Sequence, residues 1–284
     1  MRSLTTPGLY IPPDPDNSTS FDVNSVNINE NSQKTPFPYV LPPGVRREQA
    51  IGTLGNAQQN EQAMSMNICN LKDGDARGAY KIINMDMRVY ERIRMFVHAE
   101  NVASYPNTNE DGDLALFVRV GSDFENNYYE YEMPLKMSTM IGTAEPREIW
   151  LEANNIDFPL TLFRDIKMTR NALGISLNNV YEESDPDKPD NAIKIIGNPE
   201  LGLVKGMMIG VRNRKDDGKA RCVEVWVNEL RLTGFDERGG MAGLGRLDMQ
   251  MADFGNVTLS GKFSTIGFGS IEQRVNQRSR ERIY

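Results

Sequence analysis

The sequence is poor in the two side chains that most often build catalytic and metal centres. It has one histidine, His98, and two cysteines, Cys69 and Cys222, in 284 residues. One His and two Cys are too few for a zinc site with the usual four Cys and His ligands. A Ser-His-Asp or Cys-His mechanism would depend on His98, and no Gly-x-Ser-x-Gly elbow accompanies it. We therefore predict that the protein is not an enzyme and has no catalytic, metal-binding or cofactor-binding residues.

Long apolar runs are also missing. No stretch of about 18 apolar residues could form a transmembrane helix, and the N-terminus lacks the apolar core of a secretory signal. The formal charge of −7 argues against nucleic-acid binding, because phosphate contacts need a basic surface. Alone, these facts describe a soluble cytoplasmic protein. That conclusion has a gap, since transmembrane β-strands leave almost no mark on mean hydropathy.

Turn-forming residues are abundant, with 26 asparagines, 24 glycines and 15 prolines. They separate short segments, most of which alternate apolar and polar residues, the period of a half-buried strand, while residues 114–120 are almost continuously apolar, as in a central strand. The predicted strands cover residues 64–69, 93–99, 114–120, 128–133, 204–211 and 222–232. Several short strands with such spacing predict a β-sandwich or jelly roll over residues 63–235.

Two local features refine this β-sandwich. Val223, Val225 and Val227 share one parity while Leu230 and Leu232 share the other, so we predict a β-bulge near residues 228–229.

One short helix is also predicted. Asp157 would cap it, Pro159 would sit in its first turn, and Leu162, Phe163 and Ile166 would share its apolar face to an end near residues 170–171.

The two ends of the chain differ from its centre. Residues 1–62 hold eight of the 15 prolines and form an extended strap with one short edge strand at 21–28, or a disordered linker; composition does not decide between them. Residues 236–284 begin with a glycine-rich joint. Apolar residues then alternate at 247–251 and 257–263, the second run being about as long as a membrane-spanning β-strand. An ordinary amphipathic strand gives the same pattern.

Two acidic turns invite a metal-site interpretation. Residues 107–113 match the start of an EF-hand loop, but position 12 is Val118 instead of Glu and a strand follows, so we reject an EF-hand. A surface turn is the preferred interpretation, and a calcium site of another kind stays open. Residues 73–75 are interpreted as a similar turn.

Other side chains allow a functional and a structural interpretation. His98 is interpreted as a plain strand histidine, and Glu130 and Glu132 as a solvated face instead of a glycosidase pair. The aromatics Tyr128, Tyr129, Tyr131 and Trp150 could stack on sugar rings, but core packing is preferred. Cys69 and Cys222 could form a disulfide in an oxidising compartment or remain two buried thiols.

An ordered set of motifs carries a family resemblance. The motifs are VNINEN at 26–31 and YVLPPGV at 39–45, LKDGDAR at 71–77 and AYK at 79–81, MFVHAE at 95–100, GDLALFVR at 112–119 and GSDF at 121–124, NYYEYE at 127–132, EVWVNELRL at 224–232, and GFGSIEQ at 267–273. In this order they resemble an internal stretch of the SprA (Sov) family, outer-membrane translocons of the type IX secretion system in Bacteroidota.

The resemblance implies a role in the cell outer membrane. Members form a very large β-barrel that exports folded cargo with C-terminal sorting domains and supports gliding motility. Their partners are a PorV-type barrel protein, a plug protein, the cargo and membrane lipid. The chain would then be a fragment, with residues 63–235 as an all-β insertion between barrel strands and residues 246–264 starting the barrel wall. The competing hypotheses are a free-standing, surface carbohydrate-binding β-sandwich and a hydrolase that uses clustered carboxylates.

Overall fold

The computed structural model describes residues 8–10, 18–47, 60–102, 108–139, 145–214, 217–235, 240–265 and 268. Asn107 and most of the motif at 267–273 therefore lie outside the described residues. One compact unit ends at Thr233 and a second begins at Gly234. The strands of the first unit are β1 (Gly8–Tyr10), β2 (Ser20–Asn27), β3 (Gln62–Leu71), β4 (Ala76–Met85), β5 (Arg92–Asn101), β6 (Leu114–Gly121), β7 (Tyr128–Pro134), β8 (Ile156–Pro159), β9 (Tyr181–Ser184), β10 (Ala192–Ile196), β11 (Val204–Asn213) and β12 (Arg221–Thr233).

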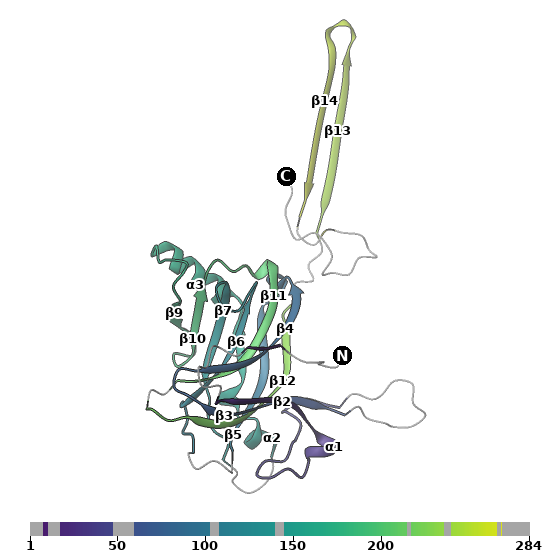
Figure 1. Ribbon diagram of the computed structural model, residues 1–284. Helices are drawn as coiled ribbons and strands as arrows, with labels where there is room; N and C mark the ends of the chain where they lie inside the picture. Colours follow the sequence, from purple (N-terminus) through teal and green to yellow (C-terminus); the bar gives the residue numbers. More distant parts are fainter. Residues whose placement is uncertain are drawn as a thin grey trace, which may run out of the picture. The chain divides into compact units, whose positions relative to one another are not determined.

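Two antiparallel sheets form the first unit (Figure 1). The seven-stranded sheet has the order β1-β4-β11-β6-β7-β10-β9, and the five-stranded sheet has the order β2-β3-β12-β5-β8. Apolar side chains from both sheets meet in one core, so the predicted sandwich of all-β class is confirmed. Eight strands, β3 to β8 with β11 and β12, follow jelly-roll order. One sheet has the order β3-β12-β5-β8, which are the first, eighth, third and sixth of these strands along the chain. The other has the order β4-β11-β6-β7, which are the second, seventh, fourth and fifth.

Alternation decides which side chains enter this core. Val118 on β6, Ile209 on β11 and Val225 on β12 point inward, while their strand neighbours point to the outer faces. The six strands predicted from the sequence are β3, β5, β6, β7, β11 and β12, and all are present. Strands β1, β4, β8, β9 and β10 were not predicted. Strands β1, β8 and β9 have only three or four residues each, and the residues of β8 were assigned to the start of the helix.

The predicted bulge in β12 is confirmed. Its pairing with β5 shifts register between Asn228 and Arg231, and Glu229 has a φ of 56°, in the left-handed region. After the bulge Leu232 packs on the core, as predicted, but Leu230 remains 39% exposed.

The predicted helix needs a correction at its start. Helix α3 spans Thr161–Ala172, so its end is close to the predicted one, but Asp157 does not cap it. Asp157 lies in β8 and pairs with Arg92 Nε at 2.7 Å, and Pro159 ends that strand. Pairing with β5 therefore prevails over local capping. Two further one-turn helices, α1 (Ile28–Asn31) and α2 (Pro146–Ile149), were not predicted.

Within the predicted strap of residues 1–62, residues 28–47 lie against the outer face of the five-stranded sheet, and from here on we call only this segment the strap. It follows the predicted edge strand, which is β2, and begins at α1, where the Asn27 side chain accepts bonds from two backbone N–H groups. Phe37 and Tyr39 of the strap are buried against Trp150 and Trp226. The outer face of this sheet is thus a second apolar layer.

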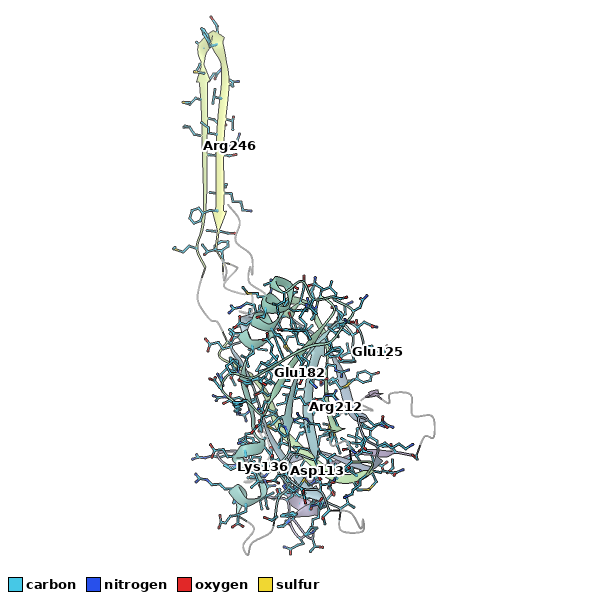
Figure 2. All side chains as sticks on the ribbon, turned by 90° about the vertical axis from the view of Figure 1, so that its left-hand side faces the viewer. Asp113, Glu125, Lys136, Glu182, Arg212 and Arg246 are labelled. Atoms are coloured by element: carbon cyan, nitrogen blue, oxygen red, sulfur yellow. A yellow bond between two sulfur atoms is a disulfide. The ribbon has the colours of Figure 1, made fainter. Side chains whose placement is uncertain are left out.

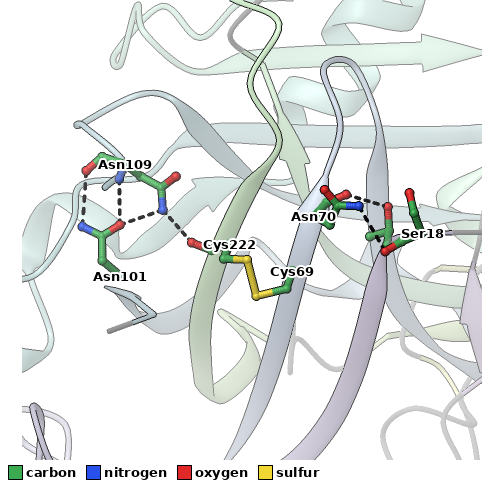
Figure 3. Close-up of a disulfide and its surroundings, with 7 residues drawn as sticks. Ser18, Cys69, Asn70, Asn101, Asn109 and Cys222 are labelled. Atoms are coloured by element: carbon green, nitrogen blue, oxygen red, sulfur yellow. Dashed lines mark hydrogen bonds between the residues drawn. A yellow bond between two sulfur atoms is a disulfide. The ribbon is translucent and has the colours of Figure 1, made fainter. Parts of the chain in front are cut away.

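A disulfide joins β3 to β12 and decides between the two alternatives for the cysteines. Figure 3 shows Cys69 and Cys222 bridged between neighbouring strands, 153 positions apart in sequence. The Asn109 side chain donates to the Cys222 carbonyl at 2.8 Å, and the Asn70 side chain donates to the Ser18 carbonyl at 3.2 Å (Figure 3). These bonds tie the loop before β6 and the segment before β2 to the bridged strands.

Removing the disulfide should lower stability strongly. In the chain-entropy description a bridge over 153 positions restricts the unfolded chain by about 5 kcal/mol, and native bridges typically contribute about 2–5 kcal/mol. We expect the Cys69→Ser/Cys222→Ser double variant to lose a free energy of unfolding in this range, measured by urea denaturation. Dithiothreitol should destabilise the wild-type chain to a similar degree and leave the double variant unchanged. Equal stability of oxidised and reduced wild-type chain would contradict this account.

Candidate functional site

His98 lies on β5 in the apolar layer under the strap. Its Nδ1 donates to the Ile149 carbonyl at 2.7 Å, and its ring lies 4.2 Å from that of Trp226. Burial lowers its pKa to about 4, so the ring is neutral at physiological pH. Ser138 Oγ is 3.1 Å from the same nitrogen, but both side chains are buried. A substrate cannot reach this Ser–His pair, and the position is that of a structural histidine.

An ion cluster fastens the strap to the sheet beside His98. Lys34 of the strap contacts the buried Glu100 carboxylate on β5, and its Nζ lies 3.1 Å from Glu224 on β12. Lys34 also lies over the Trp226 ring, 4.7 Å from the centroid. Burial raises the pKa of Glu100 to about 7, against the opposing effect of Lys34. One lysine therefore holds the strap across two strands.

Glu130 and Glu132 are not on a solvated face, so that interpretation was wrong. Both lie on the outer face of the seven-stranded sheet, yet each is only 1% exposed. Arg119 and Arg212 pair with Glu130 at 2.6 and 2.8 Å, and Lys194 pairs with Glu132 at 3.0 Å; Arg212 is labelled in Figure 2. Burial acts to raise the pKa of Glu130, but Arg212 and Arg119 overcome it and hold the pKa below its usual range.

This arrangement gives both carboxylates a structural task. A glycosidase needs one protonated acid and one free base or nucleophile beside an open cleft. Glu130 and Glu132 instead neutralise cations within a buried network.

The four aromatics proposed for sugar stacking are all buried. Tyr131 stacks on Phe158 with ring centroids 3.9 Å apart, and Tyr129 stacks on Phe163 at 5.0 Å. Trp150 donates its Nε1 hydrogen to the Val40 carbonyl of the strap at 2.8 Å. Stacking on a sugar requires an exposed ring face, so these residues pack the protein as the preferred interpretation stated.

The acidic turns bind their own chain. Asp113 pairs with Arg221 at 2.6 Å, and Asp111 Oδ1 accepts the Met137 N–H at 2.9 Å. Asp73 accepts the Gly218 N–H at 2.5 Å, which joins the turn before β4 to the turn before β12. Within the described ranges, no group of three His, Cys, Asp or Glu side chains could hold a metal ion.

The second unit contains a hairpin with two unlike faces. Strands β13 (Ala242–Met251) and β14 (Gly255–Ser264) pair along their full length, joined by the 3-10 turn η4 (Ala252–Phe254). Leu247 lies opposite Leu259, and Met249 lies opposite Val257, so most of the large apolar residues of both strands share one face, the exception being Leu244 opposite Lys262.

The other hairpin face is mostly polar. There Arg246 pairs with Asp248 at 2.8 Å, and Thr258 Oγ1 donates to the same carboxylate at 2.8 Å. Figure 2 shows side chains on both sides of this ribbon, with Arg246 labelled. Phe254, which the sequence patterns did not single out, lies in η4 and is 96% exposed. The hairpin thus offers two surfaces, one apolar and one polar.

In the part of the chain that the structure describes, no helix is long and apolar enough to cross a membrane.

Comparison with known proteins identifies one family. The SprA_N family, described as motility related/secretion protein, matches residues 7–284. No curated protein matches the chain.

The ion cluster at Lys34 should leave a mark on the pH dependence of stability. With a folded pKa of about 7 against an ordinary 4.5, Glu100 makes the folded chain bind more protons than the unfolded chain between these values. Its contribution to stability is therefore present below about pH 4.5 and is lost as pH rises through about 7. Wild type should lose this contribution between pH 5 and pH 7.5, and Glu100→Gln should not. We therefore expect the free energy of unfolding of Glu100→Gln, measured with urea, to rise relative to that of wild type over this pH range. The exposed Glu152→Gln variant is the control for replacing a carboxylate by an amide at the surface. A constant difference for Glu100→Gln would contradict the assignment.

Proposed function

We propose that the chain, which belongs to the SprA_N family of motility-related and secretion proteins, forms part of the outer-membrane channel of the type IX secretion system. The channel would conduct folded cargo carrying C-terminal sorting domains and would thereby support gliding motility. The chain's own role would be structural, without catalysis.

The observation that carries this proposal is the two-faced hairpin. Each of its strands has ten residues, within the roughly 9–11 residues with which a tilted β-strand crosses a bilayer. On its apolar face, Leu247, Met249 and Leu259 are between 42% and 59% exposed. An isolated hairpin is marginally stable in water, so these strands need neighbouring strands at their edges and an apolar medium over this face. A barrel wall supplies both.

The disulfide supports a location outside the cytoplasm. Structural disulfides persist in oxidising compartments, which include the periplasm and the cell surface. The bridge between Cys69 and Cys222 links strands that are 153 positions apart in sequence, so its formation affects the stability of the whole first unit. We propose that this unit is an insertion between barrel strands, held in an oxidising space.

The proposed partners follow from the same role. A PorV-type barrel protein, a plug protein and the secreted cargo would contact the assembled channel, and lipid would cover the apolar face of the hairpin. The two competing functions have less support. Burial of the aromatics removes the sugar platform, and the ion pairs of Glu130 and Glu132 occupy the carboxylates that a hydrolase would use.

A charge placed on the apolar face of the hairpin should block assembly. Leu259 lies near the middle of β14, where an Arg facing lipid costs about 2–4 kcal/mol. We expect Leu259→Arg in the full-length protein to reduce both its amount in the outer-membrane fraction and the amount of secreted cargo.

Thr258→Arg is the matched control, because it places the same charge one residue away on the polar face, opposite Asp248. It should behave like wild type. If Leu259→Arg assembled and secreted normally, β14 would not face lipid and the barrel proposal for this hairpin would be wrong.

A further inference from the structure

An apolar cavity of about 240 Å³ opens between the two sheets of the first unit. The seven-stranded sheet contributes Ala79 and Ile83 from β4 and Met207 from β11, and the five-stranded sheet contributes Met64 and Met95. Methionine side chains are flexible and polarizable, so walls that contain three of them can adjust to an apolar guest. All of its lining residues belong to the first unit.

The bulge of β12 forms one side of the mouth. The residues there are Asn228, Glu229 and Leu230. Because the backbone at Glu229 is left-handed, the strand turns at this point and Leu230 does not fill the space between the sheets. On the other side is β4, which pairs with β1 only from Gly78 to Tyr80 in the described structure. The cavity thus opens where β4 continues beyond this pairing.

One cation stands at this mouth. Lys81 lines the cavity on the inward parity of β4, is exposed, and has no polar partner among the described residues. The neighbouring carboxylate of Glu229 is engaged by Arg231 at 2.5 Å, and the Asn228 amide donates to Tyr39 Oη at 3.0 Å. The mouth therefore offers an available positive charge above apolar walls.

We propose that this cavity binds a free, medium-chain alkyl carboxylate, with its chain between the sheets and its carboxylate at Lys81. The charge at the mouth favours an anionic head, and the walls favour a tail without hydrogen-bonding groups, which disfavours sugars. A cavity of about 150 Å³ holds benzene, with six carbons; scaling by volume gives a chain of roughly nine or ten carbons here.

Isothermal titration calorimetry of the chain with decanoate, below its micelle concentration, tests the proposal. We expect saturable one-to-one binding of decanoate, with butyrate at least a hundredfold weaker because most of its buried methylenes are missing. Lys81→Gln should weaken decanoate binding about five- to tenfold and leave binding of uncharged decanol unchanged. Lys205→Gln, another exposed lysine on a strand of the same sheet, is the control and should bind like wild type.

Ala79→Phe fills the cavity and should reduce decanoate binding at least tenfold, with the fold checked by circular dichroism. If that variant fails to fold, Ile83→Trp at the half-buried side of the mouth carries the same test. Binding that survives cavity filling would place the ligand elsewhere, on the hairpin face for example, and would overturn the proposal. Absence of binding would also overturn it, as would equal sensitivity of decanoate and decanol to Lys81→Gln.

Discussion

The pairing of β3 with β12 is the constraint on which the rest of the first unit depends. It joins a strand near the start of the first unit's sequence to the last strand of that unit, and the Cys69–Cys222 disulfide links the two strands covalently. With β12 in place, β5 gains its long partner, the core of the two sheets closes, and Trp226 on the outer face of β12 packs against the strap. The bulge of the same strand sets the mouth of the cavity between the sheets. One long-range contact thus controls the core, the strap and the cavity.

The two outer faces of the sandwich are buried by different means. Over the five-stranded sheet, the strap adds an apolar layer with Lys34 as its ionic fastening. On the seven-stranded sheet, Glu130 and Glu132 are enclosed by cations. Removing a single partner from such a buried network leaves an uncompensated charge, which typically costs about 3–5 kcal/mol. Both faces are therefore sensitive to single substitutions, although neither belongs to the central core.

Sequence patterns predicted the elements whose surroundings repeat along the strand. Alternation and one continuous apolar run predicted six strands, and a change of parity among Val227, Leu230 and Leu232 predicted the bulge, because parity follows from the two-residue period of a strand. Asp157 shows the limit of such patterns. It suits a helix cap, but it lies in β8 and pairs with Arg92, which is 65 positions away in sequence. The burial of Glu130 shows another limit. Its position in the alternating pattern predicts an exposed side chain, but the cations that pair with it and bury it lie on other strands. Lys81 and the methionines of the cavity are separated too widely in sequence for any local pattern to relate them.

The strap also sets an order of events during synthesis. Lys34 is made early, but its partner Glu224 follows 190 residues later. At roughly 5–20 residues per second, the ribosome needs about 10–40 s to cover that interval. Throughout this time Phe37 and Tyr39 have no completed sheet to cover. Docking of the strap can therefore only be a late step, and it reports that the last strand of the sandwich has been inserted.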